Sequence, residues 1–185
     1  MSATFVPAEP RFAIHRSEYA LDPISCAPAK LADDGSSARD ATSEDGASFI
    51  SVLVMVHRSS GVSGGSKPGM VWVWAQVTPG RRARTAAMTN LTLAMPPSGS
   101  LLHTRASASQ LLGACAADDP TADIARRLSS RFKRPIFVSL NNVSTSRLTA
   151  AAVAAGPSLA LSMAQADELV ALESCLVVEL KQALQ

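Results

Sequence analysis

The sequence predicts an α+β domain with a largely antiparallel six-stranded sheet and two main helices. Three observations support this fold class. Six short segments combine apolar, β-branched and aromatic residues, as strands do. Two later segments repeat their apolar residues every three or four positions, which is typical of amphipathic helices. Only one of these helices lies between strands, so most strands follow one another directly and can pair as antiparallel neighbours.

The strands are predicted from apolar runs that turn-forming residues separate. The clearest pair is 49–58 and 70–77, which the glycine-rich loop 61–69 joins as a hairpin. That loop has the glycines and the lysine of a phosphate-binding loop. However, a serine and a proline flank Lys67 and a strand follows, so we expect no nucleotide there. The six predicted strands are 11–16, 49–58, 70–77, 90–95, 108–114 and 135–142.

Two helices complete the prediction. The first begins at the cap Asp119 and ends before Pro135. The second spans residues 162–184, where Ser162 and Gln165 have the spacing of a capping box. Each helix has one apolar stripe that faces the predicted core. The stripes are Ile124, Leu128 and Phe132 on the first helix, and Leu169, Leu172, Leu176 and Leu180 on the second.

The composition indicates one globular domain, residues 1–185. Of the 185 residues, 47% are hydrophobic and 17% are charged, and the net charge is +2. Such a chain is long enough to bury a core, and its nearly neutral charge gives no general signature of nucleic-acid binding. Three segments rich in small and turn-forming residues are predicted to be inserted or flexible: 22–47, 96–106 and 144–158.

The sequence predicts neither a secretory signal nor a membrane span. The N-terminal stretch lacks a basic region that leads into an apolar one, and the longest uncharged run, 148–166, is mostly alanine and too weakly apolar. Cys26, Cys115 and Cys175 are far apart and odd in number, as in a reduced intracellular protein. We therefore expect the protein in the cytoplasm and also in the nucleus.

Catalytic and metal-binding motifs are scarce. His15, His57 and His103 are scattered, without an HExxH motif or a cluster of histidines and cysteines, and no serine lies in a Gly-x-Ser-x-Gly turn. We therefore predict no catalytic residue, no metal and no cofactor. A cysteine and a histidine can still meet in space, so a cysteine hydrolase stays open as a third alternative.

Trp72 and Trp74 are the main candidates for a partner-binding surface. They lie two residues apart in a predicted strand and therefore share one face of the sheet. Two helices cannot cover both faces of a sheet whose strands are apolar on both sides, so we predict that a partner protein covers the tryptophans. Val52 and Val54 on the neighbouring strand are predicted to contribute, and the opposite face of the sheet is the alternative interface.

The basic side of the first helix is a second candidate surface. Arg127, Arg131 and Lys133 avoid the apolar stripe and can dock against an acidic protein surface. An ordinary solvated helix face is the alternative. RNA binding is disfavoured, because the chain has one tyrosine and five phenylalanines and no repeated stacking motif.

Five blocks of the sequence share their order and spacing with a known family. The blocks are MVWVWAQVTP, NLTLAM, SQLLG, IARRLSSRFKRPIFVSLNN and LESCLVVELKQAL. With them the chain resembles the proteasome assembly chaperone 4 family. No single block is specific, but their order and spacing together are. The positions that match the family pattern are Trp74, Thr78, Pro79, Asn90, Leu91, Ala94, Met95, Ser109, Leu111, Leu112, Gly113, Ile124, Ala125, Arg127, Leu128, Phe137, Val138 and Ser139.

This resemblance implies a non-enzymatic chaperone of 20S proteasome assembly. It further implies a heterodimer with a related assembly chaperone, the third of the series. That heterodimer binds an alpha-type proteasome subunit and promotes formation of the alpha ring. The three predicted insertions depart from the family pattern and leave the details of partner contact open. A dimerising adaptor or scaffold subunit of another protein complex is the alternative function.

Overall fold

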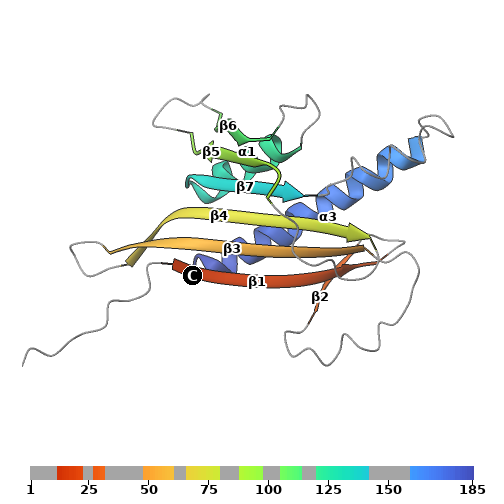
Figure 1. The fold of residues 1–185 in the computed structure, drawn as a ribbon, viewed down its shortest axis with the longest axis horizontal. Coiled ribbons are helices and arrows are strands. Elements are labelled where there is room, and N and C mark those ends of the chain that lie inside the picture. The colour runs from red at the N-terminus through yellow and green to blue at the C-terminus, as the bar shows by residue number, and fades with distance from the viewer. Residues whose placement is uncertain are drawn as a thin grey trace, which may run out of the picture.

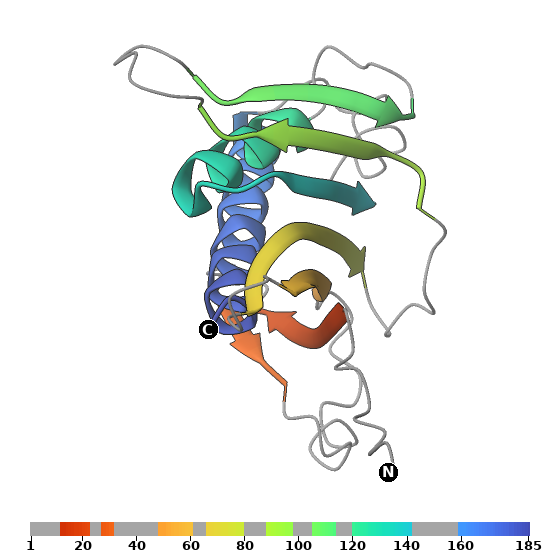
Figure 2. The ribbon, with the colours of Figure 1, turned by 90° about the vertical axis from the view of Figure 1, so that its left-hand side faces the viewer.

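In the part of the chain that the structure describes, seven strands form one mixed sheet and two helices pack on one of its faces (Figure 1 and Figure 2). This computed structural model describes residues 12–22, 27–31, 48–60, 66–79, 88–97, 105–113, 120–141 and 159–185. The strand order is β2-β1-β3-β4-β7-β5-β6. The elements are β1 Phe12–Leu21, β2 Pro28–Lys30, β3 Ser48–Ser60, β4 Ser66–Pro79, β5 Leu91–Met95, β6 Ser107–Leu112, α1 Thr121–Phe132, β7 Ile136–Asn141 and α3 Leu159–Ala183.

The α+β class is confirmed, but the predicted sheet differs from the structure in three details. β1 runs on to Leu21, whereas we predicted a strand that ends at residue 16. A seventh strand, β2, forms inside the segment 22–47 that we expected to be an insertion. Its three residues lack apolar alternation, and they are held by antiparallel pairing with Tyr19–Leu21 of β1. The sheet is also mixed, because β7 runs parallel to β4. A parallel pair needs a long crossover, which the chain through β5, β6 and α1 supplies.

The predicted apolar faces of the two helices agree with the structure, but the residues predicted to begin each helix do not. α1 follows Pro120, which carries no side-chain cap hydrogen bond, and the predicted cap Asp119 lies outside the described residues. α3 begins at Leu159, so Ser162 lies within the helix and the capping-box prediction is wrong. Leucine and alanine are strong helix formers, and they extend the helix ahead of Ser162.

The inner face of the sheet, which we define as the face toward α1 and α3, carries the hydrophobic core. Alternate residues of each central strand point into it, as the period of two requires. Phe132 and Leu169 are partly buried against this core, so both predicted helix stripes are confirmed. The core includes Ile50, Val52, Val54 and Val56 of β3, Val71, Val73, Ala75 and Val77 of β4, Ile124 and Leu128 of α1, and Leu172, Leu176 and Leu180 of α3.

Asn90, just before β5, holds the end of β7 with its side chain. Its Oδ1 atom accepts a hydrogen bond from the Leu140 amide at 2.9 Å, and its Nδ2 atom donates to the Leu140 carbonyl at 2.8 Å. The Ser139 hydroxyl donates to the same Oδ1 atom at 3.2 Å. The amide side chain therefore satisfies both backbone groups of Leu140 where the β5–β7 ladder stops at Thr92.

Asn90→Ala is expected to lower the free energy of unfolding by about 1–3 kcal/mol, because it leaves two partly buried backbone groups of Leu140 without partners. Urea unfolding followed by tryptophan fluorescence measures this loss. Asn90→Asp separates the two bonds: it keeps an acceptor for the Leu140 amide but sets a carboxylate oxygen against the Leu140 carbonyl, so its cost should be at least as large. A change below about 0.5 kcal/mol for Asn90→Ala would show that water replaces the amide.

Candidate partner-binding surface

The outer face of the sheet, opposite α1 and α3, carries a row of large apolar side chains. Cross-strand register places the members of this row directly opposite one another on five adjacent strands. In Figure 2 both helices lie on the other side of the sheet. No described helix covers this row. In order across the sheet the row is Ile14 of β1, Met55 of β3, Trp72 of β4, Phe137 of β7 and Leu93 of β5.

Leu53 and Trp74 form a second apolar row beside the first, because they pair with each other and point to the same face. We call the two rows together the apolar band. The Trp72 and Phe137 rings stack in the middle of the band with their centroids 4.2 Å apart. Ile14 is 65% exposed at one end of the band. By the same alternation, further exposed apolar side chains lie around the band: Phe12, Met70 and Met95.

The band is open to different degrees: Ile14 is exposed, Leu53, Met55, Trp72, Trp74 and Leu93 are half-buried, and Phe137 is only 9% exposed. A row of large apolar side chains that stays partly open to water is a candidate site of interaction. Its aromatic residues suit this role, because large rings bury much area with few torsion angles to fix. The band ends at a polar row in which Glu18, Ser51, Gln76 and Asn141 lie opposite one another. An ion pair of 3.0 Å between Arg16 and Glu18 lies at the border. The polar row therefore limits the band at one side.

The structure separates the four sheet residues that the sequence nominated. Trp72 and Trp74 lie in the apolar band on the outer face, as expected from their spacing. Val52 and Val54 pair with Ala75 and Val73, point to the inner face, and are only 1% and 0% exposed. A partner on the outer face cannot touch Val52 and Val54, so we no longer count them among the residues of the candidate surface. Leu53 and Met55 replace them, a choice that β3 concealed because it is apolar on both faces.

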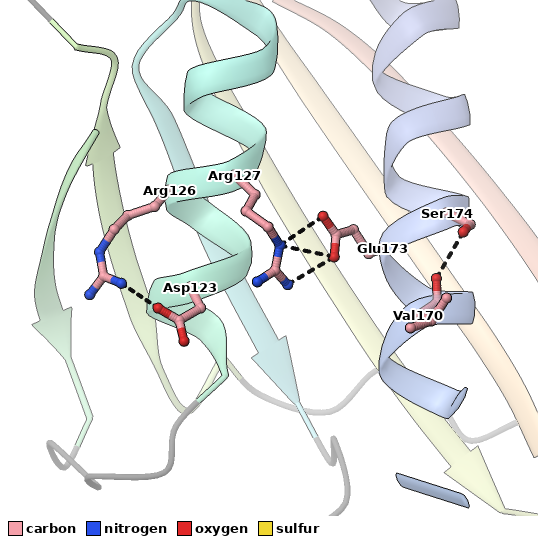
Figure 3. Close-up of polar contacts among 6 residues, drawn as sticks. All are labelled: Asp123, Arg126, Arg127, Val170, Glu173 and Ser174. Carbon is pink, nitrogen blue, oxygen red and sulfur yellow. Dashed lines mark hydrogen bonds and ion pairs between the residues drawn. The ribbon is translucent and has the colours of Figure 1, made fainter. Parts of the chain in front are cut away.

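On the helix layer, Arg127 already has a partner within the chain. Its guanidinium donates to both carboxylate oxygens of Glu173 on α3, at 2.8–3.1 Å (Figure 3). The hydrogen bonds to Glu173 raise the pKa of Arg127. Arg126 pairs with Asp123 one turn earlier on the same helix. Arg127 thus ties α1 to α3, whereas the exposed Arg131 and Lys133 stay candidates for an acidic partner.

The described residues show no arrangement for metal binding or for cysteine chemistry. They contain no group of three or more histidine, cysteine or acidic side chains that could hold a metal ion. Cys175 is 1% exposed in the core, and burial, with the nearby Glu179 charge, raises its pKa to about 12. Cys26, Cys115 and His103 lie outside the described residues. No described helix is long and apolar enough to cross a membrane.

Cys175 is expected to react with iodoacetamide at least about tenfold more slowly than a free thiol, because the thiolate is the nucleophile and this thiol is buried and protonated at neutral pH. Timed labelling of the folded protein, with mass spectrometry of the peptide that contains Cys175, measures the rate. Labelling in urea is the control and should restore free-thiol reactivity. A rate above that of a free thiol would restore the cysteine-hydrolase alternative.

A family model described as proteasome assembly chaperone 4 matches residues 62–141. The predicted family resemblance is confirmed. The part of the chain that matches proteasome assembly chaperone 4 contains β4, β5, β6, α1 and β7. It therefore includes both tryptophans, Phe137 and Leu93 of the apolar band, together with the Asn90 side chain that holds β7.

A search of solved structures finds a similar chain in a yeast complex described as a novel chaperone complex for 20S proteasome assembly. The two chains are 17% identical with a TM-score of 0.43, and the likeness covers 74% of this chain and 89% of the yeast chain. No curated protein sequence matches the chain.

Proposed function

We propose that this protein is a chaperone of 20S proteasome assembly that acts by binding and not by catalysis. The observation that carries the proposal is the position of the apolar band. Most of the band lies within residues 62–141, the segment that matches proteasome assembly chaperone 4, and no described helix covers it. Large apolar side chains gain free energy when a partner removes them from water.

The first partner in this proposal is a related assembly chaperone, the third of the series, with which the protein forms a heterodimer. The apolar band is the surface that it covers. Trp72 and Trp74 supply the large side chains that dominate the binding energy of protein interfaces. The polar row from Glu18 to Asn141 limits the contact at one side.

The second partner is an alpha-type proteasome subunit, and the heterodimer promotes formation of the alpha ring early in assembly. We assign Arg131 and Lys133 to this contact, because both are exposed on the helix layer, away from the apolar band. Arg127 supports the contact indirectly, since it holds α1 against α3 through Glu173. The protein works in the cytoplasm and in the nucleus and needs no cofactor.

Affinity purification of a tagged copy from its own cells, with mass spectrometry of the associated proteins, tests this function. One small chaperone-like protein together with alpha-type subunits, and few mature beta-type subunits, is the expected result. A tagged Trp72→Ala/Trp74→Ala copy is the control and should lose the small partner. Recovery of a stable complex without proteasome subunits would replace the proposal by an adaptor or scaffold role in that complex.

Arg131→Glu/Lys133→Glu is expected to weaken binding of the heterodimer to an alpha-type subunit about tenfold at low salt and much less at high salt, because exposed charges act over distances that salt screens. Biolayer interferometry at two salt concentrations measures the change. Lys181→Glu, on the exposed side of α3, is the matched control. Equal affinity of the double variant and the wild type at low salt would remove these residues from the interface.

A further inference from the structure

One edge of the sheet is covered only at one end. β2 pairs with Tyr19–Leu21 at the end of β1, and just beyond it the Leu31 amide donates to the Glu18 carbonyl at 2.8 Å. Among the described residues, no strand lies beside residues 12–17 on this side of β1. In Figure 1, β2 accompanies only the arrowhead end of β1.

The backbone groups that this edge presents follow from the hydrogen bonds of β2. The Glu18 carbonyl and the Asp22 amide both bond to the β2 segment, so the backbone groups of even-numbered residues of β1 point away from β3. The N–H and C=O groups of Ile14 and Arg16 therefore point outward along the same edge. They form the row that an added strand would need for its main-chain hydrogen bonds.

The side chains of this edge are unusual for an unprotected strand. Natural proteins guard free edges with proline, several charges, a bulge or a very short strand. β1 is ten residues long, and residues 12–17 contain no proline and one charged side chain, Arg16. Phe12 and Ile14 are 49% and 65% exposed, and Ile14 is also the end of the apolar band. A partner that covers the band therefore reaches this edge.

We propose that an extended strand of the partner chaperone pairs with β1 along residues 12–17, in line with β2, while the rest of that partner covers the apolar band. This inference rests on the proposed function and adds the mode of contact. The occupant must be an extended backbone, because the groups to be satisfied are main-chain N–H and C=O. It must carry an apolar side chain on the outer face, where it meets Ile14.

Amide hydrogen exchange with residue resolution tests the pairing on the full-length protein, alone and in the heterodimer purified with it. The Ile14 and Arg16 amides are expected to exchange at least about tenfold more slowly in the heterodimer. The Ala13 and His15 amides point toward β3 and are the internal controls. Unchanged exchange at Ile14 and Arg16 would overturn the proposal. Protection that grows with the concentration of the protein alone would also overturn it, in favour of pairing between two copies.

Arg16→Pro provides a second test, because proline removes the outward N–H and is tolerated at a sheet edge. We expect it to weaken heterodimer formation about tenfold, whereas Arg16→Ala, which keeps the N–H, should change affinity by less than about threefold. Equal effects of the two variants would overturn the proposal. A heterodimer with proteasome subunits but without edge protection refutes only this inference, whereas the absence of any heterodimer refutes the proposed function as well.

Discussion

Replacing Lys30 with methionine is expected to lower the free energy of unfolding by about 3 kcal/mol at neutral pH. Glu179 of α3 is only 2% exposed, and its Oε1 atom accepts hydrogen bonds from the Tyr19 hydroxyl at 2.5 Å and from the Lys30 ammonium at 2.7 Å. Without Lys30 a buried carboxylate loses its cationic partner. Because the Lys30 side chain is itself 45% exposed, water moderates the loss, which we place at the lower end of the range for buried pairs.

The same substitution is expected to reverse the pH dependence of stability. Burial raises the pKa of Glu179, but hydrogen bonds from Lys30, Tyr19 and Ser17 outweigh it, so the folded-state pKa lies below its ordinary value. In the wild type this stabilisation is present above the unfolded pKa and is lost as pH falls through the folded-state pKa. In Lys30→Met burial prevails and raises the folded-state pKa, so stability falls as pH rises from about 4 to 7.

Urea unfolding at about pH 4 and pH 7 measures both effects. Lys181→Met, at an exposed lysine of α3, is the matched control and should change stability by less than about 0.5 kcal/mol. Lys30→Met/Glu179→Gln should recover much of the loss, because a neutral amide needs no cation. A Lys30→Met protein that loses stability on acidification, as the wild type does, would contradict the expected rise in the pKa of Glu179.

Ile14→Asp is expected to weaken heterodimer formation at least about thirtyfold, because it places a charge at the end of the apolar band. Val170→Asp is the matched control: Val170 is 63% exposed, close to the 65% of Ile14, but it lies on α3. Titration calorimetry with the copurified chaperone measures both affinities, and thermal unfolding of each variant alone verifies its fold. A larger loss of affinity for Val170→Asp than for Ile14→Asp would show that the interface lies on the helix layer and not on the outer face of the sheet.

The sequence predicted those parts of the fold that rest on local periodicity. The two helix stripes and six of the strands could be found because apolar side chains repeat at the period of the element that they form. β2 could not, because three residues with a proline and a lysine have no period, and they are held by contacts with β1 and with Glu179 and Gln182 of α3.

The residues of the candidate surface could also be predicted only in part from the sequence. The spacing of Trp72 and Trp74 was enough to place them on one face, but β3 is apolar on both faces, so only the register could show that Leu53 and Met55 accompany them. Arg127 was nominated for a partner because sequence cannot show that Glu173 lies beside it on another helix. The buried Glu179 was not singled out either, since its partners come from β1 and β2.

The position of α3 has a consequence for synthesis of the chain. α3 packs against β1, β2 and β3, which are made first, whereas α1 packs against β5, β6 and β7. During synthesis on the ribosome, the inner face of β1, β2 and β3 therefore stays uncovered until α3 has been made. Until then β3, which is apolar on both faces, has no helix on its inner face. A truncation that lacks α3 should aggregate during translation, and a partner that binds the outer face early would protect only one side of the nascent sheet.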